Sequence, residues 1–339
     1  MGPGFGQHPS SGRKPFRVMS QNPTIAVLVS IFNGERHLAE CLRSVETQLQ
    51  RGDQLLIHDD GSTDKTSHIL QAWPHSLDYS HAPNQGISRS RNLLARRATA
   101  DFLIFLDGDD LLASNALEVI REHIRTHPSD CVLTPIRFFY DADRSKPDHI
   151  FFSDARSVLD DPLGFFLDSM PPAASLVVCR NAFERVGGFH PLMRHSEEFD
   201  LVVRLCLAGA RWTYQPVVVR SNRLHQGVRA SHNQRLCSWK AITVVHRLYR
   251  QRYIAELSDL HRGKMLDMTR AHGRILFRLG AIRPARAALH LADCLARTNG
   301  WQCKSLLDWL ACFLRHYNAE HLRRYINILL RRNVWGNPL

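Results

Sequence analysis

Three short apolar runs in the first third of the chain each end in polar residues. They cover residues 25–31, 55–57 and 102–106, and each stops at a cluster of Asn, Asp or Gly. Continuous apolar runs of this length are typical of strands buried on both faces of a parallel sheet. A plausible helix follows each run, so the pattern predicts repeated strand–helix units with a ligand site at the carboxyl ends of the strands.

The spacing of apolar residues predicts the helices between these strands. Helices are expected over residues 38–45, 64–73 and 115–127. Ser62 or Thr63 is a candidate cap for the second of these, and Pro128 stops the third. Arg91 is expected to lie at the start of a further helix, and the chain from residue 241 onward is expected to be mostly helical.

Carboxylates gather directly after the third apolar run, as Asp107, Asp109 and Asp110 around Gly108. Asp107 and Asp109 are two positions apart, so in an extended chain their side chains leave on the same side. No basic residue neighbours them in the run, and Mg²⁺ or Mn²⁺ suits such a set of oxygen ligands. An isolated Asp-Gly-Asp is more often a solvated turn. A second acidic cluster, residues 59–64, follows the second run and favours the metal interpretation.

Taken in order, these motifs resemble those of the family 2 glycosyltransferases, nucleotide-sugar enzymes of the GT-A fold. The matching segments are residues 29–35, 41–48, 59–64, 84–86 with 91–92, 107–109, 187–189 with 197–204, and 223–225 with Ser231. The resemblance covers about residues 23–235. It implies an α/β, GT-A (Rossmann-like) nucleotide-sugar-binding domain with a mainly parallel central sheet, followed by a helical C-terminal region.

The resemblance also implies a metal site that holds Mn²⁺ or Mg²⁺. Asp109 would bind the ion directly, and Asp107 would lie near the ion and the ribose. Asp110 is a weaker candidate, as a supporting residue or a helix cap. Arg223 and His225 would meet the diphosphate or the metal after a loop closes, because Arg suits phosphate and a neutral imidazole is a reasonable ligand.

The nucleoside is expected to contact a second set of residues. The family pattern places one carboxylate against the uracil imide, and we favour Asp60, with Asp59 close behind. Asn33 or its flanking backbone would lie near the base. Of Arg91 and Asn92, one is expected to contact the nucleotide and the other to cap or brace the loop.

The general base is expected at Glu197-Glu198, where the family usually has Glu-Asp. By position Glu198 replaces the aspartate, and its extra methylene shifts the carboxylate by roughly 1.5 Å. A carboxylate can act as the base if its site raises its basicity. Glu198 is therefore the first candidate and Glu197 the second. Arg204 is expected to brace Glu197 or Asp200.

These residues predict an inverting glycosyltransferase that moves a sugar from a UDP-sugar to a hydroxyl of a glycan or lipid-linked acceptor, as in polysaccharide or cell-envelope synthesis. One alternative is a non-catalytic relative that binds nucleotide sugar or glycan; the intact Asp107-Gly108-Asp109 argues against it. A nucleotidyltransferase is the other alternative. It would need a Gly-rich loop with Arg and Lys where residues 32–35 read Phe-Asn-Gly-Glu.

Charge divides the chain unevenly. Residues 240–339 hold 18 Lys and Arg against 6 Asp and Glu, so the net charge of +12 lies entirely in this region. We predict a disordered tail over 1–22, the GT-A domain over 23–235 and a basic helical region over 236–339. The basic region is either a solvated surface or a peripheral contact with anionic lipid. No nucleic-acid-binding module is recognisable, so nucleic acid is not an expected partner.

The predicted location is the cytoplasm, including the cytoplasmic face of a membrane. No apolar segment follows a basic start, which argues against a signal peptide, and no apolar stretch is long enough to span a bilayer. The eight cysteines are scattered without a Cys-x-x-Cys pair, which favours a reducing compartment.

Overall fold

The computed structural model describes residues 22–292. The exceptions are residues 142–146, 170–174, 192, 194–195, 225–233, 251–256, 282–283, 286 and 290. The chain forms two compact units, Met1–Val244 and Val245–Leu339.

Seven strands of the described residues form the central sheet of the first unit, in the order β10-β6-β9-β4-β1-β2-β3. They are β1 (Ile25–Ile31), β2 (Gln54–Asp59), β3 (Asp78–His81), β4 (Phe102–Asp107), β6 (Cys131–Leu133), β9 (Leu176–Cys179) and β10 (Trp212–Tyr214). The strands β4, β1, β2 and β3 run parallel. Strand β9 is antiparallel to β4 and β6, so the sheet is mixed but mainly parallel. The predicted fold class is confirmed.

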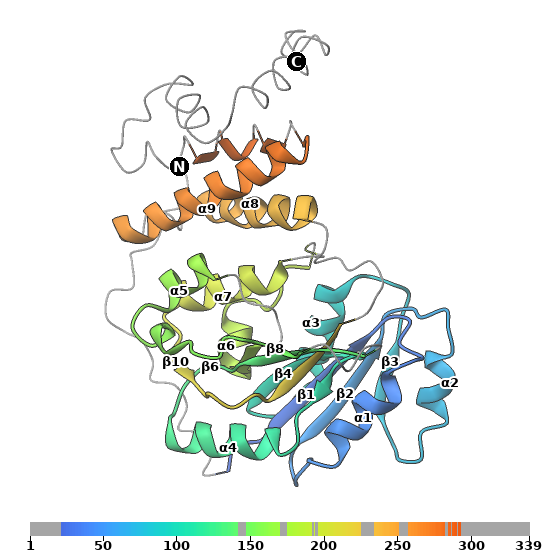
Figure 1. The fold of residues 1–339 in the computed structure, drawn as a ribbon. Helices are drawn as coiled ribbons and strands as arrows, with labels where there is room; N and C mark the ends of the chain where they lie inside the picture. Colours follow the sequence, from blue (N-terminus) through green and yellow to red (C-terminus); the bar gives the residue numbers. More distant parts are fainter. Residues whose placement is uncertain are drawn as a thin grey trace, which may run out of the picture. The chain divides into compact units, whose positions relative to one another are not determined.

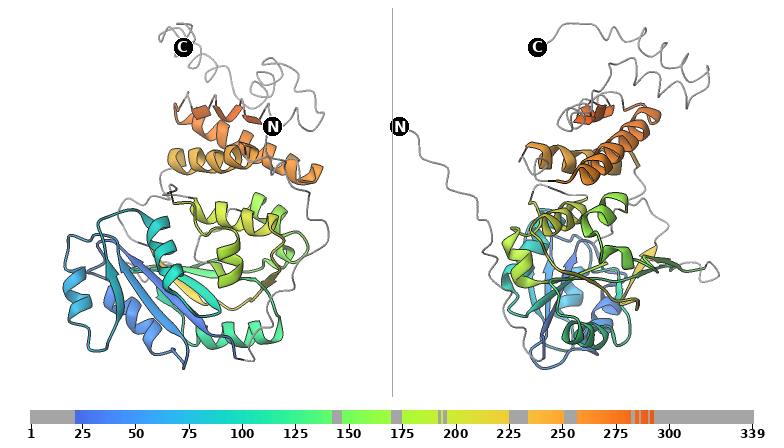
Figure 2. Two further views of the ribbon diagram at one scale, coloured as in Figure 1. Left: turned by 180° about the vertical axis from the view of Figure 1, so that it is seen from behind. Right: turned by 90° about the vertical axis from the view of Figure 1, so that its left-hand side faces the viewer.

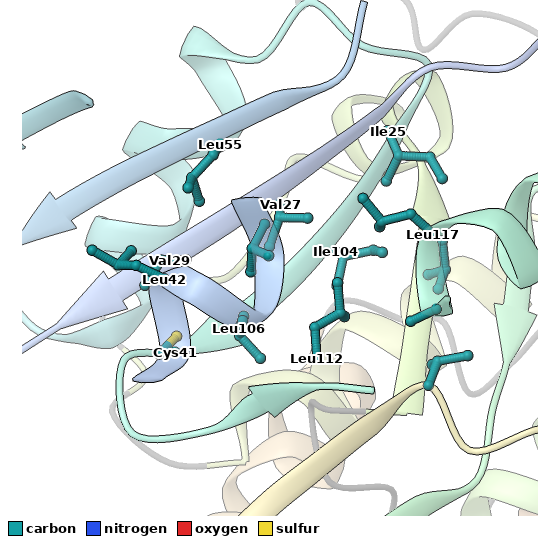
Figure 3. Packing of buried hydrophobic residues seen from close by; sticks show 14 of the residues in the cluster. Ile25, Val27, Val29, Cys41, Leu42, Leu55, Ile104, Leu106, Leu112 and Leu117 are labelled. Carbon is teal, nitrogen blue, oxygen red and sulfur yellow. The ribbon is translucent and has the colours of Figure 1, made fainter. Parts of the chain in front are cut away.

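The apolar runs form strands because both of their faces are covered. All seven residues of β1 are buried, as are the first five of β4. Val27, Val29 and Ile104 belong to one core cluster with Leu42 of the neighbouring helix (Figure 3). Burial of each such side chain stabilises the fold by roughly 1.5–3 kcal/mol. The continuous apolar pattern thus reflects the burial of both faces of the sheet.

Helices pack on both faces of this sheet. They are α1 (Leu38–Glu46), α2 (Thr66–Gln71), α3 (Ile87–Arg97), α4 (Ala116–Thr126), α5 (Pro162–Asp168), α6 (Arg180–Arg185) and α7 (Glu197–Leu207), with a 3₁₀ turn at Arg156–Val158. Helices α1 and α4 lie on one face, and α3 and α7 lie on the other (Figure 1). This arrangement leaves the carboxyl ends of β1, β2 and β4 free to carry a site.

The predicted helix ends agree with the structure at α1 and α4 and differ at α2 and α3, and Arg91 lies inside α3 rather than at its start. Helix α4 begins at Ala116 after Asn115 and ends at Thr126, as expected. Helix α2 begins at Thr66 rather than at Asp64, because the Asp64 carboxylate accepts hydrogen bonds from the Thr66 amide (3.0 Å) and hydroxyl (2.5 Å). The N-cap position of α2 is Lys65, whose side chain makes no capping hydrogen bond, so neither Ser62 nor Thr63 caps this helix.

A second sheet brings distant segments next to the end of β4. Its strands, in the order β5-β11-β7-β8, are β5 (Leu111–Leu112), β11 (Arg220–Leu224), β7 (Ile136–Tyr140) and β8 (His149–Phe151). Strand β11 runs parallel to β7 and antiparallel to β5. In the right-hand view of Figure 2 the β7–β8 hairpin, in green, reaches out from the domain. Strand β5 directly follows the loop that carries Asp107, Asp109 and Asp110, which we call the acidic loop. Strand β11 pairs with β5 and therefore lies beside this loop.

Helix α8 (Gln234–Arg250) crosses the boundary between the two units, and α9 (Asp259–Arg278) lies in the second. Ser258 caps α9 by accepting a hydrogen bond from the amide of His261 (3.3 Å). None of the described helices combines the length and the apolar character that crossing a membrane requires. The final basic segment lies outside the described residues, so its contact with lipid stays a prediction.

Candidate functional site

The polar ends of three neighbouring strands meet at one edge of the central sheet. In the strand register, Ile31 of β1 pairs with Asp59 of β2, and Ser30 of β1 pairs with Asp107 of β4. A cavity of about 960 Å³ lies at this edge. Its described lining residues include Phe32, Asn33, Asp64, Asp107, Asp109 and Asp141. The strand ends therefore form a common pocket, as the sequence predicted.

Two glycines allow the backbone to close tightly around this pocket. A Cβ on Gly108 would lie 2.8 Å from Cγ1 of Ile31, and a Cβ on Gly34 would lie 2.7 Å from Cγ2 of the same residue. Both distances are shorter than any ordinary carbon–carbon contact. Ile31 thus requires glycine in both loops, and this brings the acidic loop close to the first turn.

Asn33 organises the turn after β1, and Phe32 beside it faces solvent. Asn33 has a left-handed backbone (φ 55°), a conformation that Asn tolerates better than most residues. Its Oδ1 accepts a hydrogen bond from the amide of Thr63 (2.9 Å). The Phe32 side chain is 54% exposed, although it lies on the cavity wall. Phe32 was not among the candidate site residues in the sequence; an aromatic residue next to an Asn-Gly turn is the signal that could have revealed it.

Asp59 and Asp60 are both held by local donors. Asp59 accepts hydrogen bonds from the amide of Ser62 (2.9 Å), from Nδ1 of His81 (3.0 Å) and from Oγ of Ser67 (3.2 Å). Burial favours a higher pKa for Asp59, but these hydrogen bonds outweigh it and hold the pKa below its usual range. Among the described residues, neither Asp59 nor Asp60 lines the cavity.

Asp60 connects the end of β2 to the start of α3. Its two carboxylate oxygens accept hydrogen bonds from the amides of Gln85 (2.8 Å) and Gly86 (2.9 Å). The sequence motif at residues 84–86 therefore folds onto the second strand end. The predicted contact of Asp59 or Asp60 with a base stays a prediction.

Asp107 and Asp109 are the acidic-loop carboxylates that reach the cavity. Asp107 accepts a hydrogen bond from Nη2 of Arg91 (2.8 Å), and Nη2 of Arg220 lies 3.7 Å from its other oxygen. Burial favours a higher pKa for Asp107, but Arg91 and Arg220 hold the pKa below its ordinary value. Asp107 is therefore ionised over the whole neutral range.

Asp110 faces inward rather than into the cavity. It accepts hydrogen bonds from Nη2 of Arg220 (2.8 Å) and from the amide of Arg223 (2.9 Å). Burial raises the pKa of Asp110 to about 7, with Arg220 opposing the shift and Asp109 adding to it. Asp110 supports the loop and does not cap a helix.

The acidic loop could bind a divalent cation whose remaining coordination positions are filled by a bound ligand. Two carboxylates, from Asp107 and Asp109, lie on the wall of one cavity and offer the oxygen donors that Mg²⁺ and Mn²⁺ prefer. Within the described ranges, the structure contains no group of three or more His, Cys, Asp or Glu side chains arranged so that they could hold a metal ion by themselves. Mg²⁺ is commonly bound by one or two carboxylates together with substrate phosphates, which matches this donor set. His225 lies outside the described residues.

The candidate bases lie at the start of α7. Nη1 of Arg91 donates to both Glu198 (2.8 Å) and Glu197 (3.1 Å). The Glu197 side chain is 5% exposed and the Glu198 side chain 19%. Burial and the neighbouring Glu198 raise the pKa of Glu197 well above its ordinary value, which favours the protonated form. Glu198 is thus the more accessible carboxylate of the two.

The other predicted arginines have structural partners. Arg204 donates to Asp200 (2.7 and 2.9 Å) and to the carbonyl of Gly188 (2.7 Å), which confirms that it braces Asp200. Asn92 braces the same segment, because its side chain bonds both the amide and the carbonyl of Phe189 (2.8 and 2.7 Å).

Arg223 is buried, with its side chain 1% exposed. Its Nε donates to the carbonyl of Asp109 (2.9 Å), and its Nη atoms contact Glu40 and Asp141. Arg220, on the same strand, was not singled out from the sequence. It has no local signal there, because its partner Asp110 is 110 positions away. Strand β11 therefore holds the acidic loop through two arginines.

A family model described as "Glycosyl transferase family 2" matches residues 26–196 of the chain. The glycosyltransferase GlyA of Streptococcus pneumoniae is 28% identical over 109 residues, which cover 31% of this chain and 16% of that protein. An uncharacterized glycosyltransferase of Haemophilus influenzae is 26% identical over 190 residues, covering 53% of this chain and 61% of that protein. The chain thus spans less than two thirds of the length of either relative.

Solved structures share the fold at low sequence identity. TarS 1–349 of S. aureus in complex with UDP-GlcNAc superposes with a TM-score of 0.52 at 15% identity, covering 83% of this chain and 93% of that one. The same TarS fragment without a named ligand gives a TM-score of 0.50 at 17% identity, covering 82% of this chain and 90% of that one. At this identity the likeness establishes the fold.

Proposed function

Because the chain belongs to glycosyl transferase family 2, we propose that it transfers a sugar from a UDP-sugar to an acceptor hydroxyl with inversion of the anomeric carbon. The observation that carries this proposal is the cavity of about 960 Å³ at the strand ends, with Asp107 and Asp109 on its wall. The size suits a ligand of nucleotide-sugar dimensions. A structural neighbour, TarS, has been solved with UDP-GlcNAc, which supports UDP as the nucleotide.

The donor is proposed to lie along the cavity from the first turn to the acidic loop. Phe32 offers an exposed ring on which a base can stack, and Asn33 fixes the turn beside it. Asp107 and Asp109 would hold Mn²⁺ or Mg²⁺, which when bound supplies positive charge to the leaving diphosphate. Arg223 supports this end by fixing the backbone of Asp109.

Glu198 is proposed to remove the proton from the acceptor hydroxyl as that oxygen attacks. In one displacement, the new glycosidic bond forms while the bond from the anomeric carbon to the diphosphate oxygen breaks. The proton passes to Glu198 and the electron pair leaves with UDP. Glu198 is favoured over Glu197 because it is the more exposed of the two and the pKa of Glu197 is raised.

Binding of UDP is expected to depend on a divalent cation. We expect calorimetric titration of UDP to show tight binding with Mn²⁺ and much weaker binding with excess chelator. Asp109→Ala should remove most of the gain in UDP affinity that the metal provides. Asp148→Ala should not, because it replaces a half-exposed carboxylate that lies just before β8 and does not line the cavity among the described residues. Equal UDP affinity with and without metal would contradict the proposed donor site.

Phe32→Ala is expected to weaken UDP binding by about 5- to 150-fold, since stacking of a base on an aromatic ring contributes roughly 1–3 kcal/mol. Calorimetry with Mn²⁺ held constant measures the effect. Tyr79→Ala is the matched control, because Tyr79 is also an exposed aromatic residue (38%) but does not line the cavity among the described residues. Equal losses in both variants would rule out a stacking role for Phe32.

A further inference from the structure

One guanidinium, that of Arg91, joins the donor side of the site to the candidate bases. Nη2 donates to Asp107 at the end of β4 (2.8 Å). Nη1 donates to Glu198 (2.8 Å) and Glu197 (3.1 Å) at the start of α7. The carboxylates come from segments about ninety residues apart in the sequence, and a single side chain sets the spacing between them.

Arg91 lies behind the cavity rather than on its wall. Its side chain is 2% exposed, and among the described residues the wall includes Asp107 but not Arg91. The guanidinium lies over the ring of Phe189, with Cζ 5.5 Å from the ring centroid. Both Nη atoms are committed to carboxylates, so a contact with the nucleotide would require Arg91 to leave partners that it holds in this structure.

Among the described residues, the hydrogen bonds of the Arg91 side chain all come from its two Nη atoms. Its Nε is buried and has no hydrogen-bond partner in the described part of the chain. A buried donor without a partner costs free energy. Nη1 and Nη2, in contrast, both donate to carboxylates, and these carboxylates belong to two different elements, β4 and α7.

We propose that Arg91 is a positioning residue for the transfer reaction, which fixes the carboxylate of Glu198 relative to Asp107 and so sets the distance between base and donor. This inference rests on the proposed function. In-line attack requires the acceptor oxygen, the anomeric carbon and the leaving diphosphate oxygen to be aligned, with the base within hydrogen-bond reach of the acceptor hydroxyl. A misplacement of 1 Å can cost about 10²-fold in rate. The planar fork of Arg holds two carboxylates at fixed angles, whereas the single ammonium of Lys cannot.

Release of UDP from a UDP-sugar, with water as the acceptor, tests the proposal without knowledge of the natural acceptor. Arg91→Lys is expected to lower kcat about 10²-fold while KM for the donor changes by less than about threefold. In a Glu198→Gln background, Arg91→Lys should add less than about threefold, because the two residues act as a unit. Arg89→Lys is the matched control, since Arg89 lies on the same helix and is exposed; it should leave kcat unchanged.

A second variant distinguishes the loss of the guanidinium from a general disturbance of the fold. Arg91→Gly should recover part of its lost kcat when methylguanidinium is added, and Arg89→Gly should not respond. If the fold loss of kcat in the double variant equals the product of the losses in Arg91→Lys and Glu198→Gln, the positioning role is wrong. A raised KM and Kd for the donor with unchanged kcat would also do so and would identify Arg91 as a nucleotide contact. If the wild type releases no UDP from any donor, the proposed function itself fails, and the role of Arg91 fails with it.

Discussion

Glu198→Gln is expected to lower UDP-sugar turnover by about 10²- to 10⁴-fold, the usual range for loss of a general base. Glutamine keeps the shape of the side chain and can still meet Arg91, but it cannot accept the proton. The affinity for UDP should stay within about threefold of wild type, because Glu198 is not on the described wall of the donor cavity. Steady-state kinetics and calorimetry on the same preparation separate the two effects.

Glu197→Gln is the matched control for this experiment. Glu197 lies next to Glu198 and shares the same nitrogen of Arg91. Burial raises the pKa of Glu197 well above its ordinary value, which favours the neutral carboxyl. Glutamine resembles a neutral carboxyl in shape and polarity, so we expect less than about a fivefold loss, far below the effect of losing a general base. The reverse order of effects would make Glu197 the base and would contradict the assignment of Glu198.

The sequence predicted the strands and the acidic loop because their signals are local. The runs that form β1 and β4 are apolar at every position because both faces of the sheet are covered. Asp107 is the last residue of β4 and Asp109 comes two positions later, so their place at the sheet edge follows from that strand alone. Their meeting with the turn at Asn33 follows from the parallel order of β4, β1 and β2.

The parts that the sequence did not predict depend on contacts between distant segments. Strand β9 enters the sheet antiparallel between β4 and β6, and nothing in its four residues specifies that place. Arg91 was expected as a nucleotide contact or a brace, but its three carboxylate partners are visible only once α7 packs beside α3. Only the folded chain shows which charges an arginine faces.

Arg220→Met is expected to lower the free energy of unfolding by about 3–5 kcal/mol at neutral pH. The Arg220 and Asp110 side chains are 2% and 4% exposed, and they form a direct ion pair (2.8 Å). Arg220 also donates to the carbonyl of Phe105. Methionine fills much of the volume but leaves the Asp110 carboxylate without its cation. Loss of one partner of a buried pair costs more than the pair contributes, since the remaining carboxyl must either stay charged without its cation or take up a proton. Urea unfolding followed by circular dichroism measures the change.

The cost of Arg220→Met should grow with pH, and this separates an electrostatic cause from a packing defect. Burial raises the pKa of Asp110 to about 7 and Arg220 opposes that shift, so removal of Arg220 raises the pKa further. A carboxyl with a raised folded pKa keeps its proton in the folded state and loses it in the unfolded state, so stability falls as pH rises through this window. The variant should therefore lose more stability than wild type between about pH 6 and pH 8.5.

Arg125→Met provides the reference for an exposed pair, since Arg125 is 60% exposed and its partner Glu122 is 49% exposed. Its loss should cost less than about 1 kcal/mol, with little dependence on pH. Asp110→Asn in the Arg220→Met background should restore part of the lost stability, because the amide removes the uncompensated charge. A cost for Arg220→Met that is independent of pH and unaffected by Asp110→Asn would show that packing, rather than the buried charge, holds the acidic loop against β11.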